Sequence, residues 1–135
     1  MLKAYKYRIY PNKEQRIYFA KTFGCVRFVY NQMLADRIKF YEENKELDIK
    51  KIKYPTPAQY KQEFHWLKEV DSLALANAQM NLNKAYKNFF RDKSVGFPKF
   101  KSKKNNYNNY TTNNQKGTVY IENSHIKLPK LKSMM

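Results

Sequence analysis

Residues 25–41, CVRFVYNQMLADRIKFY, decide the fold of this chain. Apolar residues recur in this stretch at intervals of three and four, which places them along one face of an α-helix. They are Val26, Val29, Tyr30, Met33, Leu34, Ile38 and Tyr41. A helix with one apolar face needs other elements to cover that face, so we expect a helix over residues 25–44 to lie in the core.

The residues just before this stretch predict another helix. Asn12 and Gln15 have the spacing of a capping box, in which each side chain bonds the backbone N–H of the other residue. This box begins a helix over residues 13–22, and Gly24 then permits a turn. Two helices joined in this way resemble a helix-turn-helix, although an ordinary helical hairpin has the same spacing.

Two further helices are predicted in the middle of the chain. A third helix covers residues 57–68, because a second capping box and a proline mark its first turn. The residues of that turn are Thr56, Pro57 and Gln59. A fourth helix runs from a cap at Asp71 or Ser72 to about residue 92. Its inward face holds Leu75, Ala78, Leu82, Ala85, Tyr86 and Phe89.

Strands are predicted at both ends of the chain. Residues 3–10 alternate between an apolar face with Tyr5, Tyr7 and Ile9 and a basic face, as in a half-buried strand. Short strands near the C-terminal end cover residues 107–112, 118–121 and 126–128, with turns near residues 113–117 and 123–124. A first strand commonly pairs with later ones, so the helices form an insertion in one small sheet. The predicted fold class is α+β.

The charge of the chain is concentrated at its two ends. The formal net charge is +16, from 27 Lys and Arg against 11 Asp and Glu. Residues 1–30 hold seven basic residues and one acid, and residues 93–135 hold nine and one. Charge of one sign repels itself unless a polyanion neutralises it. Nucleic acid is therefore favoured as the partner over the alternative of a protein merely kept soluble by lysine.

Several classes of site are excluded by the composition. Cys25 is the single cysteine, so this chain alone forms neither an internal disulfide nor a cysteine-based zinc site. The three glycines leave no room for a glycine-rich phosphate loop. No stretch has the apolar length of a signal peptide or a membrane span, so we expect an intracellular protein without a membrane partner.

No catalytic centre is expected from the residues. His65 and His125 each lack a carboxylate and a nucleophile at a telling spacing, so both are interpreted as structural or surface histidines. The acids are scattered, whereas a two-metal nuclease needs clustered carboxylates. We therefore predict no catalytic residue, no metal site and no cofactor in this chain.

A basic and aromatic run, residues 96–104 (GFPKFKSKK), carries the strongest binding signal. Its lysines alternate with phenylalanines; cations neutralise phosphates, and flat rings stack on unpaired bases. A loose basic loop is the alternative, but such a loop has no use for Phe97 and Phe100. The asparagines of residues 105–114 can bond base edges or simply form a polar turn.

Six motifs occur in an order that resembles a known family. They are KAYKYRIYPNKEQ, FGCVRFVYNQMLADRI, WLKEVDSLALANA, AYKNFF, GFPKFKSKK and IKLPKL. Together they resemble the N-terminal part of TnpB (OrfB) proteins, which belong to bacterial insertion sequences. The resemblance covers nearly the whole chain, and several independent motifs in the right order make it specific.

The resemblance implies a fold and an activity. TnpB proteins resemble type V CRISPR nucleases and are RNA-guided DNA endonucleases. Their N-terminal region is a small β-barrel (wedge) domain interrupted by a helical recognition insertion. It grips a structured guide RNA and reads a short motif in duplex DNA. By this resemblance, residues 1–11 form the first wedge strand, residues 12–95 the four-helix insertion, and residues 96–135 the wedge strands of a complete or incomplete barrel.

The same resemblance limits the expected activity. In the family a RuvC-like domain with three carboxylates and a zinc ribbon cuts DNA, and this chain is expected to stop before it. We therefore expect nucleic-acid binding without catalysis, in the bacterial cytoplasm and on the nucleoid when bound. One alternative is the N-terminal part of an RNA-guided endonuclease that acts with a separately encoded nuclease part. Another is a non-functional transposon relic.

Candidate binding residues follow from charge and from the resemblance. Phosphate contacts are expected from Lys3, Lys6, Arg8, Arg91, Lys99, Lys101, Lys103 and Lys104. Phe100 and Tyr107 are expected to stack on bases or to anchor their loop. The resemblance places Thr112 and Asn113 near the motif-bearing duplex, together with the start of the fourth helix. There Ser72, Leu73 and Ala76 stand where relatives can carry longer polar or aromatic side chains.

Overall fold

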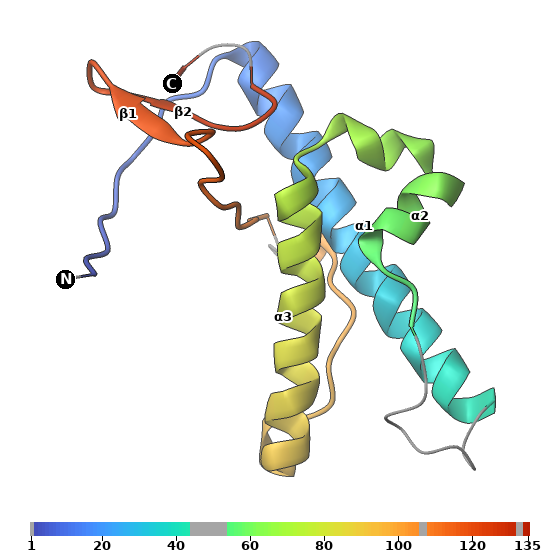
Figure 1. Cartoon of the computed structure of the whole chain (residues 1–135). Coiled ribbons are helices and arrows are strands. Elements are labelled where there is room, and N and C mark those ends of the chain that lie inside the picture. Colours follow the sequence, from blue (N-terminus) through green and yellow to red (C-terminus); the bar gives the residue numbers. More distant parts are fainter. Residues whose placement is uncertain (1, 44–53, 106–107, 132–133) are drawn as a thin grey trace.

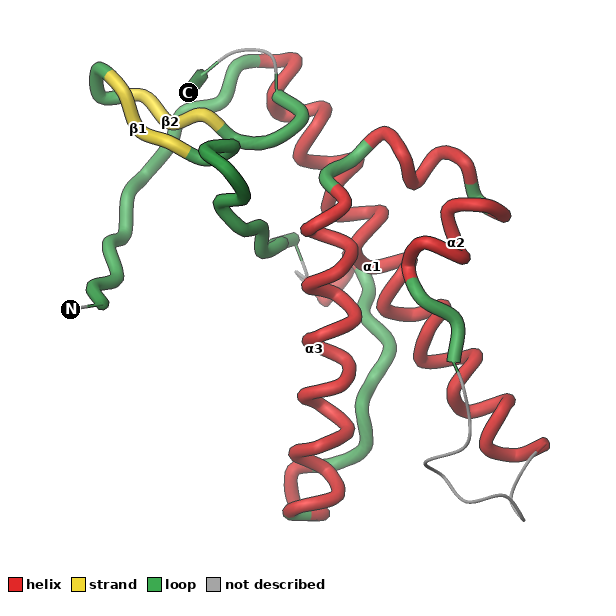
Figure 2. The backbone as a smooth tube through the Cα atoms, viewed as in Figure 1, coloured by secondary structure: helices red, strands yellow, loops and turns green. Residues whose placement is uncertain are grey.

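The computed structural model describes residues 2–43, 54–105, 108–131 and 134–135 of the chain. Three α-helices pack together, and a two-stranded sheet lies beside one end of them (Figure 1). Long loops connect these parts, and one of them runs back alongside the helices (Figure 2). The part of the chain that is described is therefore α+β, as the sequence predicts.

The first helix, α1 (Lys13–Glu43), is continuous, so the prediction of two helices separated at Gly24 is wrong. Its predicted start is confirmed. Asn12 N donates to Gln15 Oε1 at 2.7 Å, and Gln15 N donates to Asn12 Oδ1 at 2.9 Å. The capping box therefore forms and satisfies backbone donors that would otherwise lack partners.

Packing explains why Gly24 does not interrupt α1. A glycine inside a helix costs about 1 kcal/mol relative to alanine, which burial of neighbouring side chains offsets. Thr22, Cys25 and Val26 are all buried, so the inward face of the helix continues across Gly24. The Thr22 hydroxyl is also satisfied, because Oγ1 donates to Tyr18 O at 2.9 Å. Burial of these neighbouring side chains therefore outweighs the local tendency of Gly24 to end the helix.

The second helix, α2 (Pro57–Glu63), starts as predicted and ends early. Gln59 Oε1 accepts from Thr56 N at 2.8 Å, which confirms the capping box. Phe64 then leaves the helical conformation (φ −114°, ψ 82°), and a 3₁₀ turn, η2 (His65–Glu69), follows. The Phe64 ring packs edge-on against Phe28 of α1 with centroids 4.8 Å apart. This contact with α1 favours the break that helical periodicity alone does not reveal.

The third helix, α3 (Ser72–Arg91), agrees with the fourth helix predicted from sequence. Asp71 caps it, with Oδ1 accepting from Leu73 N at 3.0 Å. A short 3₁₀ turn, η3 (Lys93–Val95), follows. The core lies mainly between α1, α3 and η2. Its fully buried side chains include Val29, Met33, Leu34, Leu67, Val70, Leu75 and Leu82.

The sheet is a single antiparallel hairpin of β1 (Tyr120–Glu122) and β2 (His125–Lys127). Ile121 pairs with Ile126. The two turn residues, Asn123 and Ser124, have φ values of 50° and 61°, as in the left-handed turns that join hairpin strands most tightly. The predicted turn at residues 123–124 and the strands around it are thus confirmed, within one or two residues.

The other predicted strands do not form. Residues 3–10 and 108–112 have neither helix nor strand, and residue 107 lies outside the described residues. Residues 2–10 are exposed throughout. Alternation predicts a strand only where a partner strand supplies the ladder hydrogen bonds, and within the described residues the hairpin is the only sheet. The described chain therefore contains no β-barrel.

The GFPKFKSKK run lies back along the helices and ends in a 3₁₀ turn, η4 (Lys103–Asn105). Pro98 is buried, and the Phe97 ring meets Tyr86 and Phe89 edge-on with centroids 5.4 Å from each. The side chain of Asn31 in α1 forms two hydrogen bonds with the backbone of Lys101. Its Nδ2 donates to Lys101 O and its Oδ1 accepts from Lys101 N, each at 2.7 Å. The run is therefore fixed to the helices and is no loose loop.

Candidate nucleic-acid interface

The start of α3 and residues 111–113 form one surface. Thr112 Oγ1 donates to Asp71, the carboxylate that caps α3. Five residues into the helix, Asn77 Nδ2 lies 2.7 Å from Asn113 Oδ1 and 3.1 Å from Thr111 O. The two groups that the resemblance places near a duplex, far apart in sequence, are thus neighbours in the structure. We call this surface the α3-start surface.

Most of the side chains expected on the α3-start surface are accessible. Ser72 and Asn113 are exposed, and Leu73 and Ala76 are half-buried. Asp71 and Asn77 are buried beneath them, at 4% and 9% exposure. The buried pair holds the surface together, and this role was missed by sequence reasoning. A buried asparagine among the alanines and leucines of a helix face is the signal that could have revealed it.

Tyr18 of α1 connects this surface to the C-terminal part of the chain. Its hydroxyl accepts from Asp71 N at 3.2 Å and donates to Pro129 O at 3.3 Å. Burial is the main reason that the pKa of Tyr18 is raised, so the hydroxyl keeps its proton and can donate. Nearby, Gln15 Nε2 donates to Met134 O at 3.2 Å. The two basic ends of the sequence therefore meet at the first half of α1.

The expected phosphate ligands do not form a single patch. Lys3, Lys6 and Arg8 are exposed on the N-terminal segment, which runs away from the helices (Figure 1). Arg91 lies at the opposite end of α3 from Ser72, about 30 Å away along a helix of this length. Lys99, Lys103 and Lys104 are exposed on the GFPKFKSKK run.

Lys101 departs from the expectation of a free phosphate ligand. Its ammonium lies over the Tyr30 ring, 4.2 Å from the centroid, and is half-buried. Burial lowers its pKa, because the charged form loses water contacts. A cation held over a ring and partly desolvated already has a partner inside the protein. Lys101 is therefore better explained as an anchor of the run.

The aromatic residues of the run divide in a similar way. Both phenylalanines are exposed, at 44% for Phe97 and 52% for Phe100. What separates them is that the Phe97 ring meets Tyr86 and Phe89 edge-on, so an anchoring role fits Phe97 better. Tyr107 lies outside the described residues.

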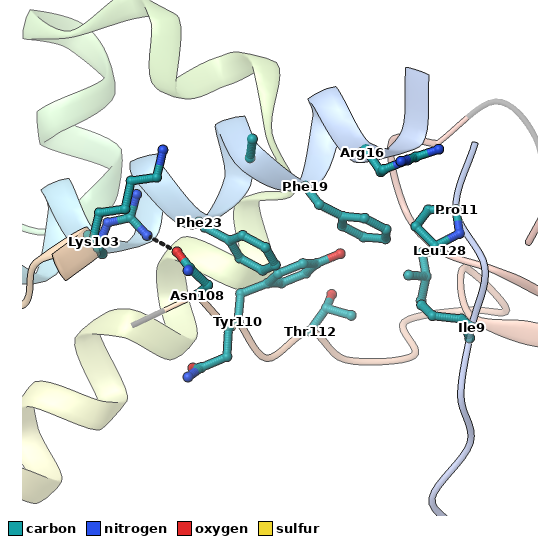
Figure 3. A pocket seen from close by; sticks show the side chains of 13 residues that line it. Ile9, Pro11, Arg16, Phe19, Phe23, Lys103, Asn108, Tyr110, Thr112 and Leu128 are labelled. Carbon is teal, nitrogen blue, oxygen red and sulfur yellow. Dashed lines mark hydrogen bonds between the residues drawn. The ribbon is translucent and has the colours of Figure 1, made fainter. Parts of the chain in front are cut away.

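A groove of about 730 Å³ lies between the first half of α1 and residues 108–112 (Figure 3). The rings of Phe19, Phe23 and Tyr110 form its wall, with centroids 6.0 to 6.2 Å apart. Ile9 and Leu128, from the two ends of the chain, close one end of it. We call this cavity the aromatic groove.

The charged side chains that line the aromatic groove are cations. They are Arg16, Arg27 and Lys103, and the lining contains no acid among the described residues. Arg27 Nη1 donates to Asn108 Oδ1 at 2.7 Å, which ties α1 to the opposite wall. Sequence reasoning missed this site. Arg16, Phe19, Phe23 and Arg27 recur at intervals of three and four, so a second helical face could have been recognised in α1.

Comparison with known proteins identifies the kinship of the chain. A family model described as a helix-turn-helix domain, carrying the OrfB and IS605 label, matches residues 1–46. A relative named "Virulence protein VsdF", from Salmonella dublin, is 38% identical over 113 residues, which span 76% of this chain and 95% of VsdF. Another, named "Putative RNA-guided DNA endonuclease InsQ", from Escherichia coli K12, is 36% identical over 136 residues and aligns with 96% of this chain.

The chain belongs to the TnpB (OrfB) family.

A third relative, named "Putative RNA-guided DNA endonuclease", comes from Streptomyces pristinaespiralis and is 38% identical over 104 residues. The chain spans 26% of the length of that protein and 32% of InsQ, about a quarter to a third of the two relatives. The segment matched by the helix-turn-helix model holds one continuous helix here. The match therefore reports membership of the TnpB family and not a turn inside α1.

Among the described residues of this TnpB-family chain, no group of three or more His, Cys, Asp or Glu side chains is placed to hold a metal ion. In the same part of the chain, no helix combines the length and apolar character needed to cross a membrane.

Proposed function

We propose that this chain binds nucleic acid, with structured guide RNA and duplex DNA as its ligands, and has no catalytic activity of its own. The observation that carries the proposal is the meeting of the two basic ends. Tyr18 bonds Pro129, Gln15 bonds Met134, and Ile9 and Leu128 line the same groove. These contacts bring parts of the basic segments 1–30 and 93–135 together at the first half of α1, and a polyanion would relieve the repulsion between their charges.

The proposed roles of individual residues follow from their exposure. The α3-start surface approaches duplex DNA through Ser72, Leu73, Ala76, Thr112 and Asn113. Exposed cations bind phosphates, namely Lys3, Lys6, Arg8, Arg91, Lys99, Lys103 and Lys104, and Phe100 stacks on an unpaired base. Lys101 is left out of this set because its ammonium lies over Tyr30. Tyr107 stays a proposed stacking residue from sequence alone.

The proposal keeps the division of the chain drawn from the resemblance. Residues 12–95 act as the recognition insertion, and residues 1–11 and 96–135 belong to the wedge domain that flanks it. The exposed N-terminal segment and the hairpin are two of the described parts of that domain. They support the proposal because Ile9 of the N-terminal segment and Leu128, which directly follows the hairpin, line the same groove.

A salt titration tests the binding proposal. Filter binding with duplex DNA and with a structured RNA is repeated at increasing salt, because phosphate contacts release counterions. Three proposed ligands are changed to Gln in one variant: Lys99, Lys103 and Lys104. A control variant loses the same charge at exposed lysines of the middle of the chain: Lys39, Lys68 and Lys84.

The first variant is expected to flatten the slope of log K against log salt by about 3, and the control to leave it nearly unchanged. Undetectable affinity at low salt, or affinity that does not fall as salt rises, would contradict the proposal. Equal effects of the two variants would show that net charge matters and that the run has no special role.

A second candidate function is the N-terminal part of an RNA-guided endonuclease that works with a nuclease part encoded separately. Two relatives carry the name RNA-guided DNA endonuclease, and this chain spans 26% and 32% of them. A neighbouring reading frame with the nuclease carboxylates would support this candidate, and a flanking sequence without one would remove it. Cooperative thermal melting of the purified chain would remove the further alternative of an unfolded relic.

A further inference from the structure

We propose that the aromatic groove holds an unpaired nucleobase of a single strand, next to the duplex contact of the α3-start surface. This inference rests on the proposed function and adds a second, chemically different ligand site to it. Three features support it: the flat wall, the charge of the rim, and the position of the groove.

The wall of the aromatic groove is suited to a flat ligand. The Phe19 and Phe23 rings are nearly parallel, with an interplanar angle of 16° and centroids 6.2 Å apart. Tyr110 leans against both, at 40° and 55°. All three side chains are only half-buried, so their faces remain accessible (Figure 3). Every base has a π-face that can stack on such rings, but a base exposes that face only when it is unpaired.

The rim selects an anion. Arg16, Arg27 and Lys103 are the charged residues of the lining within the described chain. The Asp71 carboxylate accepts a hydrogen bond from Thr112 of the lining but is not itself part of it. Arg16 and Arg27 are eleven residues apart on α1, about 16 Å along the helix axis, so the rim extends over several phosphates of one strand. An apolar wall with a purely cationic rim fits a base together with its phosphates better than it fits an uncharged apolar ligand.

The groove also offers groups that read base edges. Asn109 is exposed at the lining, and the Asn108 amide stands opposite α1, where Arg27 holds it. Amides donate and accept hydrogen bonds, as the edges of bases do. Thr112 lines the groove and also bonds Asp71. The groove is therefore continuous with the α3-start surface, and a strand that leaves a duplex there can enter it.

The test compares single-stranded and duplex ligands with matched variants. In one variant Phe19→Leu and Phe23→Leu remove the flat wall and keep apolar volume. In the control, Tyr41→Leu and Phe90→Leu change two exposed aromatics outside the groove. Fluorescence anisotropy then measures affinity for a labelled oligothymidine and for a labelled duplex, and thermal melting verifies that each variant is folded.

The groove variant is expected to lose about five-fold or more in affinity for the single strand, as the loss of one stacked base predicts. Its affinity for the duplex is expected to change less than two-fold, and the control variant to behave like the unchanged chain. Unchanged affinity for the single strand overturns the groove site and leaves the proposed function standing. If the unchanged chain binds neither the single strand nor the duplex, both the groove site and the proposed function are overturned.

A second measurement needs no variant. A strand with 5-iodouridine is cross-linked to the unchanged chain by light, and the modified peptides are identified by mass spectrometry. Cross-links at Phe19, Phe23 or Tyr110 are expected. Cross-links found only elsewhere overturn the site. A protein partner is the remaining alternative. It is supported if an acidic peptide binds the unchanged chain but not the Phe19→Leu and Phe23→Leu variant, while binding of the single strand does not depend on these two residues.

Discussion

Two segments of this chain have similar composition but differ in how they contact the helices. Residues 2–10 and residues 97–113 are both basic and rich in aromatics. The first is exposed throughout, whereas the second is fixed to the helices at Phe97, Lys101, Thr112 and Asn113. The difference lies in the partners that α1 and α3 provide, namely Asn31, Tyr30, Asp71 and Asn77. Composition alone therefore does not distinguish a segment that is fixed by hydrogen bonds and ring contacts from one that is exposed.

The largest expected effect comes from removing the strongest attachment of the second segment. Asp71→Ala takes away both the cap of α3 and the acceptor of Thr112, so we expect a loss of about 3 kcal/mol in the free energy of unfolding. Urea denaturation measures it. Asp92→Ala removes the exposed cap of η3 and serves as the control, with little expected change. Equal effects would mean that Thr112 contributes nothing to this attachment.

The next effect distinguishes two phenylalanines of the same run. Phe97→Ala removes the edge-on contacts with Tyr86 and Phe89, and we expect a loss of about 2 kcal/mol. Phe100 is similarly exposed, at 52% against 44% for Phe97, but is not fixed by such edge-on contacts among the described residues, so Phe100→Ala is expected to leave stability within about 0.5 kcal/mol. Thermal melting of both variants measures the difference. Equal destabilisation would show that Phe100 also anchors the run.

A smaller effect on stability tests whether α1, the helix that both segments contact, is continuous. In a continuous α1, Gly24→Ala should stabilise the fold by roughly 0.5 to 1 kcal/mol. An added Cβ at Gly24 has room, since its nearest neighbour would be Arg27 Nη2 at 3.9 Å. Chemical denaturation gives the sign. Destabilisation would indicate that Gly24 makes a turn after all, as the sequence first suggests.

The smallest effect on stability is expected in the first segment. Changing Lys3, Lys6 and Arg8 together to Gln should leave the melting temperature unchanged, because these exposed side chains hold nothing in the described fold. Under the proposed function the same variant lowers the slope of log K against log salt for duplex DNA by about 3. A clear loss of stability would instead place residues 2–10 among the structural parts of the chain.

The sequence predicted what depends on neighbouring residues. The capping boxes at Asn12 and Thr56, the cap at Asp71 and the turn at Asn123 use groups within a few positions of one another, and all four were correctly located. These signals fixed the starts of the helices and the hairpin.

What the sequence did not predict depends on distant partners. The strand expected over residues 3–10 required a neighbouring strand, and residues 3–10 form no strand. The position of Lys101 depends on its contact with the ring of Tyr30 in α1. The aromatic groove joins α1 to residues 108–112 and Leu128. Contacts between residues that are distant in sequence leave no local sequence signal, so the candidate site was predicted less completely than the helices that position it.

The shared carboxylate of Asp71 has a dynamic consequence. The same group orders the first turn of α3 and restrains Thr112. Motion of residues 111–113 and fraying of the helix end are therefore thermodynamically linked. A ligand that pulls Thr112 away leaves the carboxylate free to cap more tightly or to turn to water, and either change alters the hydrogen-exchange rate of the Leu73 amide. That single amide can report, from inside the protein, on what happens at its surface.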